Sequence, residues 1–211
     1  MGSTLCIRQF VVSPLESNSF LVADPESDEA MVIDAGGGAS AIVDAVREDG
    51  LTMKAIVITH GHADHIAAAG DLKQALGCPI MIHKLDAPCL TDPEANLSML
   101  AGFGEIVVPP ADVLLKDGDE VTLGSLRFRI LYTPGHTVGG ICILHDSYLF
   151  TGDTLFAGSI GRADFPGGSL EQLIESISTK LLTLPDETTV LSGHGPSTTI
   201  GKERRANPWL R

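Results

Sequence analysis

The sequence has few positive charges, few aromatic residues and no long basic run. It contains 14 Lys and Arg against 27 Asp and Glu, a formal net charge of −13. Nucleic acids and anionic membrane surfaces are bound through clustered Lys and Arg, so neither is expected as a partner. Aromatic residues make up only 5% of the chain, whereas 23 Gly and 12 Pro indicate many turns. This composition favours an α/β domain with a site built from loops over a helical bundle.

Paired cysteines and long apolar runs are also absent. Cys6, Cys78, Cys89 and Cys142 form no C-x-x-C pair, so neither a disulfide framework nor a cysteine-rich zinc site is indicated, and we expect reduced core residues. No stretch approaches the roughly 18 apolar residues of a membrane span. The opening MGSTLCIRQF lacks the basic region and apolar run of a secretory signal. We therefore expect a cytoplasmic protein with no membrane partner.

Short apolar runs bounded by turn residues predict two series of strands and helices. The first series is expected to contain strands at 4–12, 18–24, 29–36, 53–60 and 78–83, and helices at 38–50 and 66–77. The second is expected to contain strands within 118–136, 139–146, 147–156 and 188–195, and a helix at 169–184. Between them the signal weakens, with a helix expected near 94–101. Because no linker separates the series, we expect one domain over residues 1–211, built from two similar halves packed sheet to sheet.

Three of the predicted strands end in a polar segment that contains histidine. The segments are IVITHGH, LYTPGH and VLSGHG. If these strands lie in neighbouring sheets, their ends meet at one edge, which is where we expect the functional site.

The segment THGHADH places His60, His62, Asp64 and His65 within six positions. Side chains two positions apart on an extended loop point to the same side, so His60 and His62 can share one cation. One cation cannot easily use all four side chains, because metal–ligand bonds of about 2.0 Å would crowd so short a loop. The segment therefore predicts two adjacent cations, with Asp64 and His65 on the second.

Three further residues, each beside glycine and after a predicted strand, are candidates to complete the site. They are His136 in TPGHT, Asp153 in TGDT and His194 in SGHG. Five His and two Asp suit two zinc-like ions about 3.5–4 Å apart, and a carboxylate best spans such a pair, so Asp153 is the expected bridge.

Three other residues of these types have expected roles outside the set of metal ligands. His83 and His145 fit no motif and are expected to be structural. Asp34, which also ends a strand, is expected either to orient a ligand histidine or to serve as a plain turn residue.

The motifs THGHADH, TPGHT, GDTLF and SGHGP, in that order, resemble those of the metallo-β-lactamase superfamily over nearly the whole chain. The resemblance implies a four-layer αββα sandwich with the metal site at the shared edge of the sheets. It also implies the ligand sets, which are His60, His62 and His136 for metal 1, Asp64, His65 and His194 for metal 2, and Asp153 for both.

Within the superfamily, GDTLFAGSIGRADFPGG and GPSTTIGKERRANPWL are most similar to the short glyoxalase II-like hydrolases. The resemblance implies hydrolysis of a thioester by a metal-bridging hydroxide, with S-D-lactoylglutathione as the first substrate to test and Asp64 as a catalytic hydrogen-bond acceptor. The expected cofactors are two divalent ions, Zn first, with Fe or Mn as alternatives. Glyoxalase II proper has a C-terminal helical domain that contacts glutathione. Because the sequence ends at Arg211, we expect no such domain in this protein. Class B β-lactamases differ at His65 and Asp153, so β-lactam hydrolysis is not expected.

Other interpretations stay open at this point. One is a persulfide dioxygenase with a single Fe(II) on His60, His136 and Asp153; others are a lactonase and a metal-retaining interaction protein. Arg162 is expected either to contact an anionic substrate or to pair with an acid such as Asp164. Phe156 is expected either to line the pocket or to lie in the core. The partner is expected to be a small molecule such as a glutathione conjugate, and the oligomeric state is left open.

Overall fold

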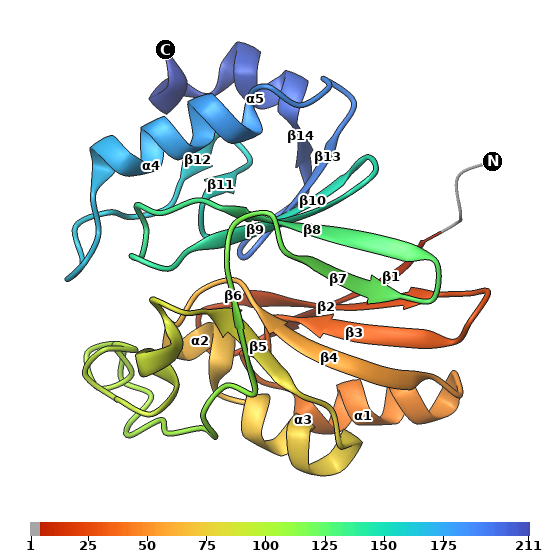
Figure 1. The fold of residues 1–211 in the computed structure, drawn as a ribbon. Helices are drawn as coiled ribbons and strands as arrows, with labels where there is room; N and C mark the ends of the chain where they lie inside the picture. The colour runs from red at the N-terminus through yellow and green to blue at the C-terminus, as the bar shows by residue number, and fades with distance from the viewer. Residues whose placement is uncertain (1–4) are drawn as a thin grey trace.

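Two six-stranded sheets lie face to face, with helices on their outer sides (Figure 1). The structure, a computed structural model, describes residues 5–211, so Thr4 of the first predicted strand lies outside it. The arrangement is the αββα sandwich that the sequence predicted.

In the first sheet the strands lie side by side in chain order from β1 to β6. The strands β1, β2 and β3 pair antiparallel, and the strands β3, β4, β5 and β6 pair parallel. Its strands are β1 (Cys6–Val12), β2 (Ser17–Asp24), β3 (Glu29–Ile33), β4 (Thr52–Ile58), β5 (Ile80–His83) and β6 (Val113–Leu115). Every residue of β2 is buried. Because side chains alternate along a strand, Leu21 packs toward the outer helices while Phe20 and Val22 pack between the sheets.

The second sheet has the order β14-β13-β10-β9-β8-β7. Its strands are β7 (Glu120–Leu123), β8 (Leu126–Tyr132), β9 (Ile141–His145), β10 (Tyr148–Gly152), β13 (Thr189–Ser192) and β14 (Thr198–Thr199). A small ribbon of β11 (Leu155–Phe156) and β12 (Ser159–Ile160) follows β10. The predicted strand at 147–156 is thus divided in two, with Asp153 between the parts.

Helices cover both outer faces. The first sheet is covered by α1 (Ala39–Glu48) and α3 (Ala69–Leu76), and the second by α4 (Leu170–Ser176), the π-helical η2 (Ile177–Leu181) and α5 (Ile200–Ala206) (Figure 1). Shorter turns are α2 (Ala63–Ile66), η1 (Ala87–Leu90) and η3 (Pro208–Leu210). Within residues 5–211, every helix is too short or too polar to cross a membrane.

Two predicted helices differ in the structure. Residues 94–101 form successive turns rather than a helix, because Leu97 adopts a left-handed backbone with φ 62°. The predicted helix at 66–77 is interrupted at Ala68, whose φ of −98° and ψ of 0° separate α2 from α3. The short elements β6, β12, β14 and α5 were not predicted.

The cysteines are free, but only two of them lie in the core. Cys78 and Cys142 are buried as expected, whereas Cys6 is exposed and Cys89 is half-buried. The prediction of core cysteines was therefore wrong for those two, because β1 lies at the edge of its sheet and Cys89 lies on the turn after β5.

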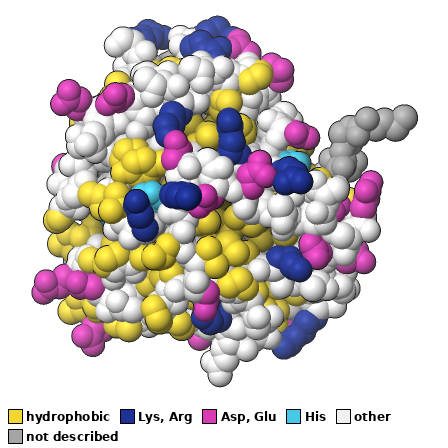
Figure 2. Space-filling view, viewed as in Figure 1, with side chains coloured by type: hydrophobic (Ala, Val, Ile, Leu, Met, Phe, Trp, Pro, Cys, Tyr) yellow, Lys and Arg dark blue, Asp and Glu magenta, His cyan; other side chains and the backbone are white. Residues whose placement is uncertain are grey.

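The edge of the first sheet opposite β1 is formed by β6. Val113 and Leu114 of this strand are exposed, and Figure 2 shows hydrophobic side chains gathered over the part of the molecule where Figure 1 places β5 and β6.

Strand direction decides where the polar segments gather. In the second sheet β8, β10 and β13 run in the same direction, so their carboxyl ends lie at one edge. The carboxyl end of β4, in the first sheet, faces them across the sandwich, because Ile141 donates its backbone N–H to the Thr59 carbonyl that follows β4. All of the predicted histidine-bearing strand ends therefore meet.

Candidate metal centre

The structure brings all seven predicted metal ligands together at this edge. They fall into three overlapping groups, and within each group the ligand atoms lie within 4.8 Å of one another. The first group is His60, His62 and His136, the second group is Asp64, His65 and His194, and the third, which links them, is His60, His65 and Asp153. His60 and His62 follow β4, and Asp64 and His65 lie on α2. The other three come from the second half of the chain, after β8, β10 and β13.

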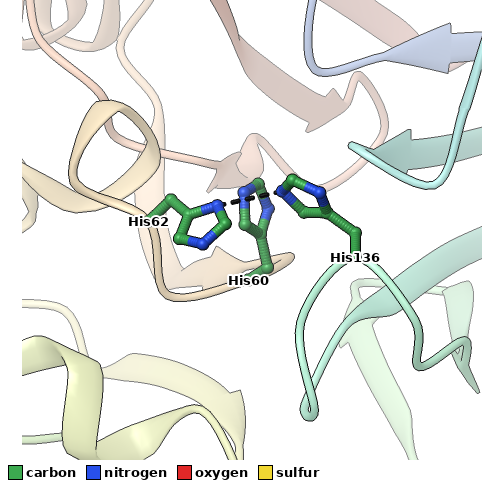
Figure 3. Close-up of side chains that lie close together, drawn as sticks. All are labelled: His60, His62 and His136. Atoms are coloured by element: carbon green, nitrogen blue, oxygen red, sulfur yellow. Dashed lines mark hydrogen bonds between the residues drawn. The ribbon is translucent and has the colours of Figure 1, made fainter. Parts of the chain in front are cut away.

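The first group joins the two halves directly. His136 Nε2 lies 2.9 Å from His62 Nδ1. The ring centre of His60 is 4.9 Å from that of His62 and 4.7 Å from that of His136. Figure 3 shows the three rings turned toward one another, with His60 and His62 on one loop and His136 on the facing loop.

The second group lies beside the first. His194 Nε2 is 3.1 Å from Asp64 Oδ2 and 3.4 Å from His65 Nε2. Asp153 lies between the groups, because its Oδ2 is 3.6 Å from both His136 Nε2 and His194 Nε2. This is the location expected for a carboxylate that bridges two ions.

Two buried side-chain nitrogen or oxygen atoms of the described residues have no hydrogen-bond partner. They are His60 Nε2 and Asp153 Oδ1, both at the centre of the cluster. Leaving such atoms unpaired costs free energy, so native structures seldom contain them without a ligand, an ion or a water. A donor set of imidazoles and carboxylates suits Zn, Fe or Mn. The residues therefore fit a pair of divalent ions.

Two histidines of the first group, His60 and His62, are held neutral. Burial lowers the pKa of His60 well below its usual value, and the neighbouring His65 and His136 lower it further. Burial and the nearby His136 lower the pKa of His62 to about 3. Because only neutral imidazole binds a metal, these two side chains are ready to do so at neutral pH.

The second group, by contrast, carries a proton in the metal-free protein. Burial alone would lower the pKa of His65, but the carboxylates of Asp64, Asp153 and Asp34 outweigh it and raise that pKa to about 10. Burial would raise the pKa of Asp64, yet His65 and His194 hold it below its usual range. These carboxylates therefore surround a positive charge, which fits a cation site.

Hydrogen bonds to the Nδ1 atoms orient the imidazoles. The Nδ1 of His136 donates to the Arg162 carbonyl at 2.6 Å, and that of His194 lies 3.1 Å from the Leu15 carbonyl. Partners of this kind fix the ring and leave Nε2 free for a metal. The Nδ1 of His62, which faces His136, has no such partner.

Asp34 contacts the ring of a candidate ligand histidine, as one of its two expected roles requires. Its Oδ2 lies 2.9 Å from His65 Nδ1. The same carboxylate accepts the backbone N–H and the hydroxyl of Thr59. Asp34 is also a turn residue, with a left-handed φ of 58°.

The other two histidines lie outside the three groups. His83 stacks on Tyr132 with ring centres 4.5 Å apart, and His145 stacks on Phe128 while its Nδ1 lies 2.9 Å from the Arg127 carbonyl. These contacts fit the structural role expected for both.

A cavity of about 430 Å³ borders His62 and Asp64. Its apolar wall is formed by Leu15, Ala63, Leu97, Leu100, Ala101 and Phe165. Arg162 also lines the cavity, where it donates two hydrogen bonds to Asp164 and lies over the Phe165 ring at 4.2 Å. Arg162 thus has the ion pair that was one of its expected roles, while it stays beside the site.

Phe165, which was not predicted from the sequence, lines the cavity, whereas Phe156, which was predicted, lies elsewhere. The ring centre of Phe156 is 6.1 Å from that of His194, but Phe156 does not border this cavity. Phe165 closes the string GR-x-DF, which could have indicated it.

Comparisons with known proteins agree with this geometry. The family model for the metallo-beta-lactamase superfamily matches residues 12–194. The chain is 42% identical over 183 residues to hydroxyacylglutathione hydrolase GloC of Haemophilus influenzae, covering 83% of this chain and 84% of that protein.

Two solved structures share the fold over almost their whole length. BLEG-1 B3 metallo-beta-lactamase matches with a TM-score of 0.93 at 37% identity, covering 97% of this chain and 99% of that one. TTHA1623 in a di-iron-bound form matches with a TM-score of 0.85 at 37% identity, covering 96% of this chain and all of that one. The chain therefore belongs to the metallo-beta-lactamase superfamily.

Proposed function

We propose that the protein is a binuclear metal-dependent hydrolase of thioesters, with S-D-lactoylglutathione or a related hydroxyacyl thioester as substrate. The observation that carries the proposal is the position of Asp153, whose carboxylate lies between two groups of ligands. The likeness to a hydroxyacylglutathione hydrolase supports the substrate class. The di-iron form of a relative supports two ions and keeps iron beside zinc and manganese as a candidate.

The metal ligands are assigned as follows. His60, His62 and His136 would hold the first ion, Asp64, His65 and His194 would hold the second, and Asp153 would serve both. When bound, two such ions lower the pKa of water and polarise a carbonyl group, which is the chemistry that ester and thioester hydrolysis needs.

Asp64 has a second proposed role, as an acceptor of a hydrogen bond from the attacking water. Its side chain borders both the cavity and the metal centre, and its low pKa keeps it ionised and able to accept a hydrogen bond. We assign it to orient the attacking water, in addition to binding the second ion.

The cavity supplies the remaining contacts. Its apolar wall excludes water from the reacting carbonyl, and Arg162 offers its guanidinium to an anionic group of the substrate. Because Arg162 also binds Asp164 and both are exposed, we expect this contact to adjust affinity rather than to drive catalysis.

The direct experiment is a substrate panel on the metal-loaded protein. The release of free thiol measures the cleavage of S-D-lactoylglutathione and of a neutral acyl thioester. A lactone and a β-lactam are tested beside them, and the β-lactam is included because one structural relative is named a metallo-beta-lactamase. We expect thiol release that does not depend on oxygen and is lost in His62→Ala but kept in His83→Ala. Turnover of the lactone or the β-lactam with no thioester cleavage would contradict the proposal.

A second candidate is a persulfide dioxygenase that uses one Fe(II). His60, His136 and Asp153 supply two imidazoles and a carboxylate, and Asp153 Oδ2 lies 3.6 Å from His136 Nε2. One iron per chain and oxygen consumption on glutathione persulfide would favour this function over thioester hydrolysis.

A further inference from the structure

Asp86 is a buried carboxylate that the metal chemistry described above does not use. It lies in the turn after β5, and its side chain is completely inaccessible. Although Asp86 is the N-cap residue of η1, its side chain makes no capping hydrogen bond. The carboxylate therefore serves contacts outside its own element.

Those contacts are to the two loops that carry the first metal group. The Oδ2 atom accepts the backbone N–H of Gly61 at 3.0 Å and the hydroxyl of Thr137 at 2.7 Å, and Oδ1 accepts the backbone N–H of Gly139 at 2.6 Å. Gly61 separates His60 from His62, and Thr137 directly follows His136. One carboxylate thus joins the ligand loop of the first half to the ligand loop of the second.

The two loops also pack tightly on the turn that holds Asp86. A Cβ atom on Gly139 would lie 2.5 Å from the backbone nitrogen and from Oδ1 of Asp86. A Cβ on Gly61 would lie 2.3 Å from the Cβ of Cys89 and 3.2 Å from the Asp86 carbonyl. Glycine at both positions is what allows the loops to approach this carboxylate.

The contacts suit an ionised carboxylate, which can accept a hydrogen bond at both oxygens. Each oxygen faces a backbone N–H, which can only donate, so both oxygens must accept. Burial raises the pKa of Asp86, and the hydrogen bonds from Thr137, Gly61 and Gly139 oppose that rise. An asparagine of the same shape would turn an NH₂ donor toward a backbone donor.

We propose that Asp86 is a positioning residue that holds the His60–His62 loop and the His136 loop at the separation required by the first metal ion. It touches neither the ion nor the substrate. It acts on the first site alone, because its partners adjoin the ligands of that site and none of the second.

The test measures zinc affinity in competition with a chromophoric chelator, with no substrate present. Asp86→Asn is made in a His194→Ala background, which retains the first site, and in a His136→Ala background, which retains the second. We expect the substitution to weaken the first site about 10-fold to 100-fold, the range for a residue hydrogen-bonded to a ligand shell. The second site should change less than about twofold.

Glu203→Gln is the matched control. Glu203 is a buried carboxylate that accepts hydrogen bonds from Thr198, Gly158 and Asn207, away from both ligand loops. It should leave zinc affinity unchanged in both backgrounds. If Asp86→Asn lowers zinc affinity equally at both sites, or does not lower it at the first site, the proposal is overturned.

Thr137→Val keeps the test decisive if Asp86→Asn does not fold. It removes one of the three donors and leaves the carboxylate in place, so we expect a smaller loss confined to the first site. An unchanged or uniform titration in this variant would contradict the proposal. Because zinc affinity is measured without substrate, a protein that does not hydrolyse thioesters could still show the expected effect of Asp86 on zinc binding. A protein that hydrolyses thioesters could likewise fail to show it, so the two proposals are tested separately.

Discussion

His136 Nε2 lies 2.9 Å from His62 Nδ1, although the two residues are 74 positions apart and follow strands of different sheets. The metal centre therefore forms only when the two halves of the sandwich close on each other. An ion bound by both loops binds the folded chain and not the unfolded one, so it stabilises the fold.

Metal removal is expected to lower the melting temperature. An ion present at 100 times its Kd contributes about 2.7 kcal/mol, and in a chain of this size each kcal/mol shifts Tm by roughly 2–4 °C. We expect a fall of about 5–10 °C per ion removed by chelation, reversed when the metal is restored. Scanning calorimetry on samples of known metal content measures this fall in Tm. An unchanged Tm in protein from which all metal has been removed would count against a centre shared by both halves.

Substitution of a ligand should abolish turnover while the fold is retained. His62→Ala and Asp153→Ala each remove a side chain that faces the centre, so the loss in kcat/KM should exceed the roughly 100-fold cost of altering a residue that only supports a ligand. Thioester hydrolysis and circular dichroism are measured on the same preparations. Retained activity in both variants would show that the site is assigned wrongly.

His83→Ala is the matched histidine control. The imidazole stacks on Tyr132 and belongs to none of the three ligand groups. We expect kcat/KM within about twofold of the parent, with a loss of stability of about 0.5–1.5 kcal/mol from the stacked pair. A large fall in rate at full metal content would place His83 in the catalytic machinery.

Metal binding at the second site should release protons. The carboxylates around His65 raise its pKa to about 10 in the metal-free protein, so at pH 8 the ring is protonated and an ion must displace that proton. Affinity should therefore rise about tenfold or more per pH unit between pH 7 and 9. The lowered pKa values of His60 and His62 mean that neither ring contributes such a rise at the first site.

Titration calorimetry in buffers of different ionisation enthalpy counts these protons at pH 8. The His136→Ala protein, which keeps the second site, should release at least one proton per ion bound. Binding at that site with no proton release would contradict the assignment of His65 as a ligand.

Arg162 should affect binding of charged substrates only. Arg162→Ala is expected to raise KM for a glutathione thioester about twofold to fivefold, the worth of an exposed ion pair, and to leave a neutral thioester unaffected. Asp164→Asn frees the guanidinium and should lower KM for the same anionic thioester. Equal effects of Arg162→Ala on both substrates would assign the side chain to loop structure instead.

The convergence of the seven candidate ligands could be predicted from the sequence because each residue leaves a local signal. His60, His62, Asp64 and His65 are close together in one segment, and the other three lie beside glycine after an apolar strand. The direction of those strands then brings the segments to one edge. The sequence predicted this meeting only on the condition that the strands lie in neighbouring sheets, because an apolar pattern identifies a strand but not its direction.

Other features have no local signal. The partners of Asp86 lie 25 to 53 positions away, and nothing in HKLDAP distinguishes this acid from an ordinary turn residue. The apolar pattern of 94–101 suggested a helix, but the left-handed backbone of Leu97 and the hydrogen bond from the Ser98 N–H to the Asn96 side chain form turns instead. Tertiary contacts decide such segments, and they cannot be inferred from spacing.

The most direct test of the account is the metal content of the purified protein beside that of Asp153→Ala and His83→Ala. We predict two divalent ions per chain in the parent and in His83→Ala, fewer in Asp153→Ala, and thioester hydrolysis only where both ions are present. Full hydrolytic activity in protein that holds no metal, or only one ion per chain, would contradict the binuclear centre.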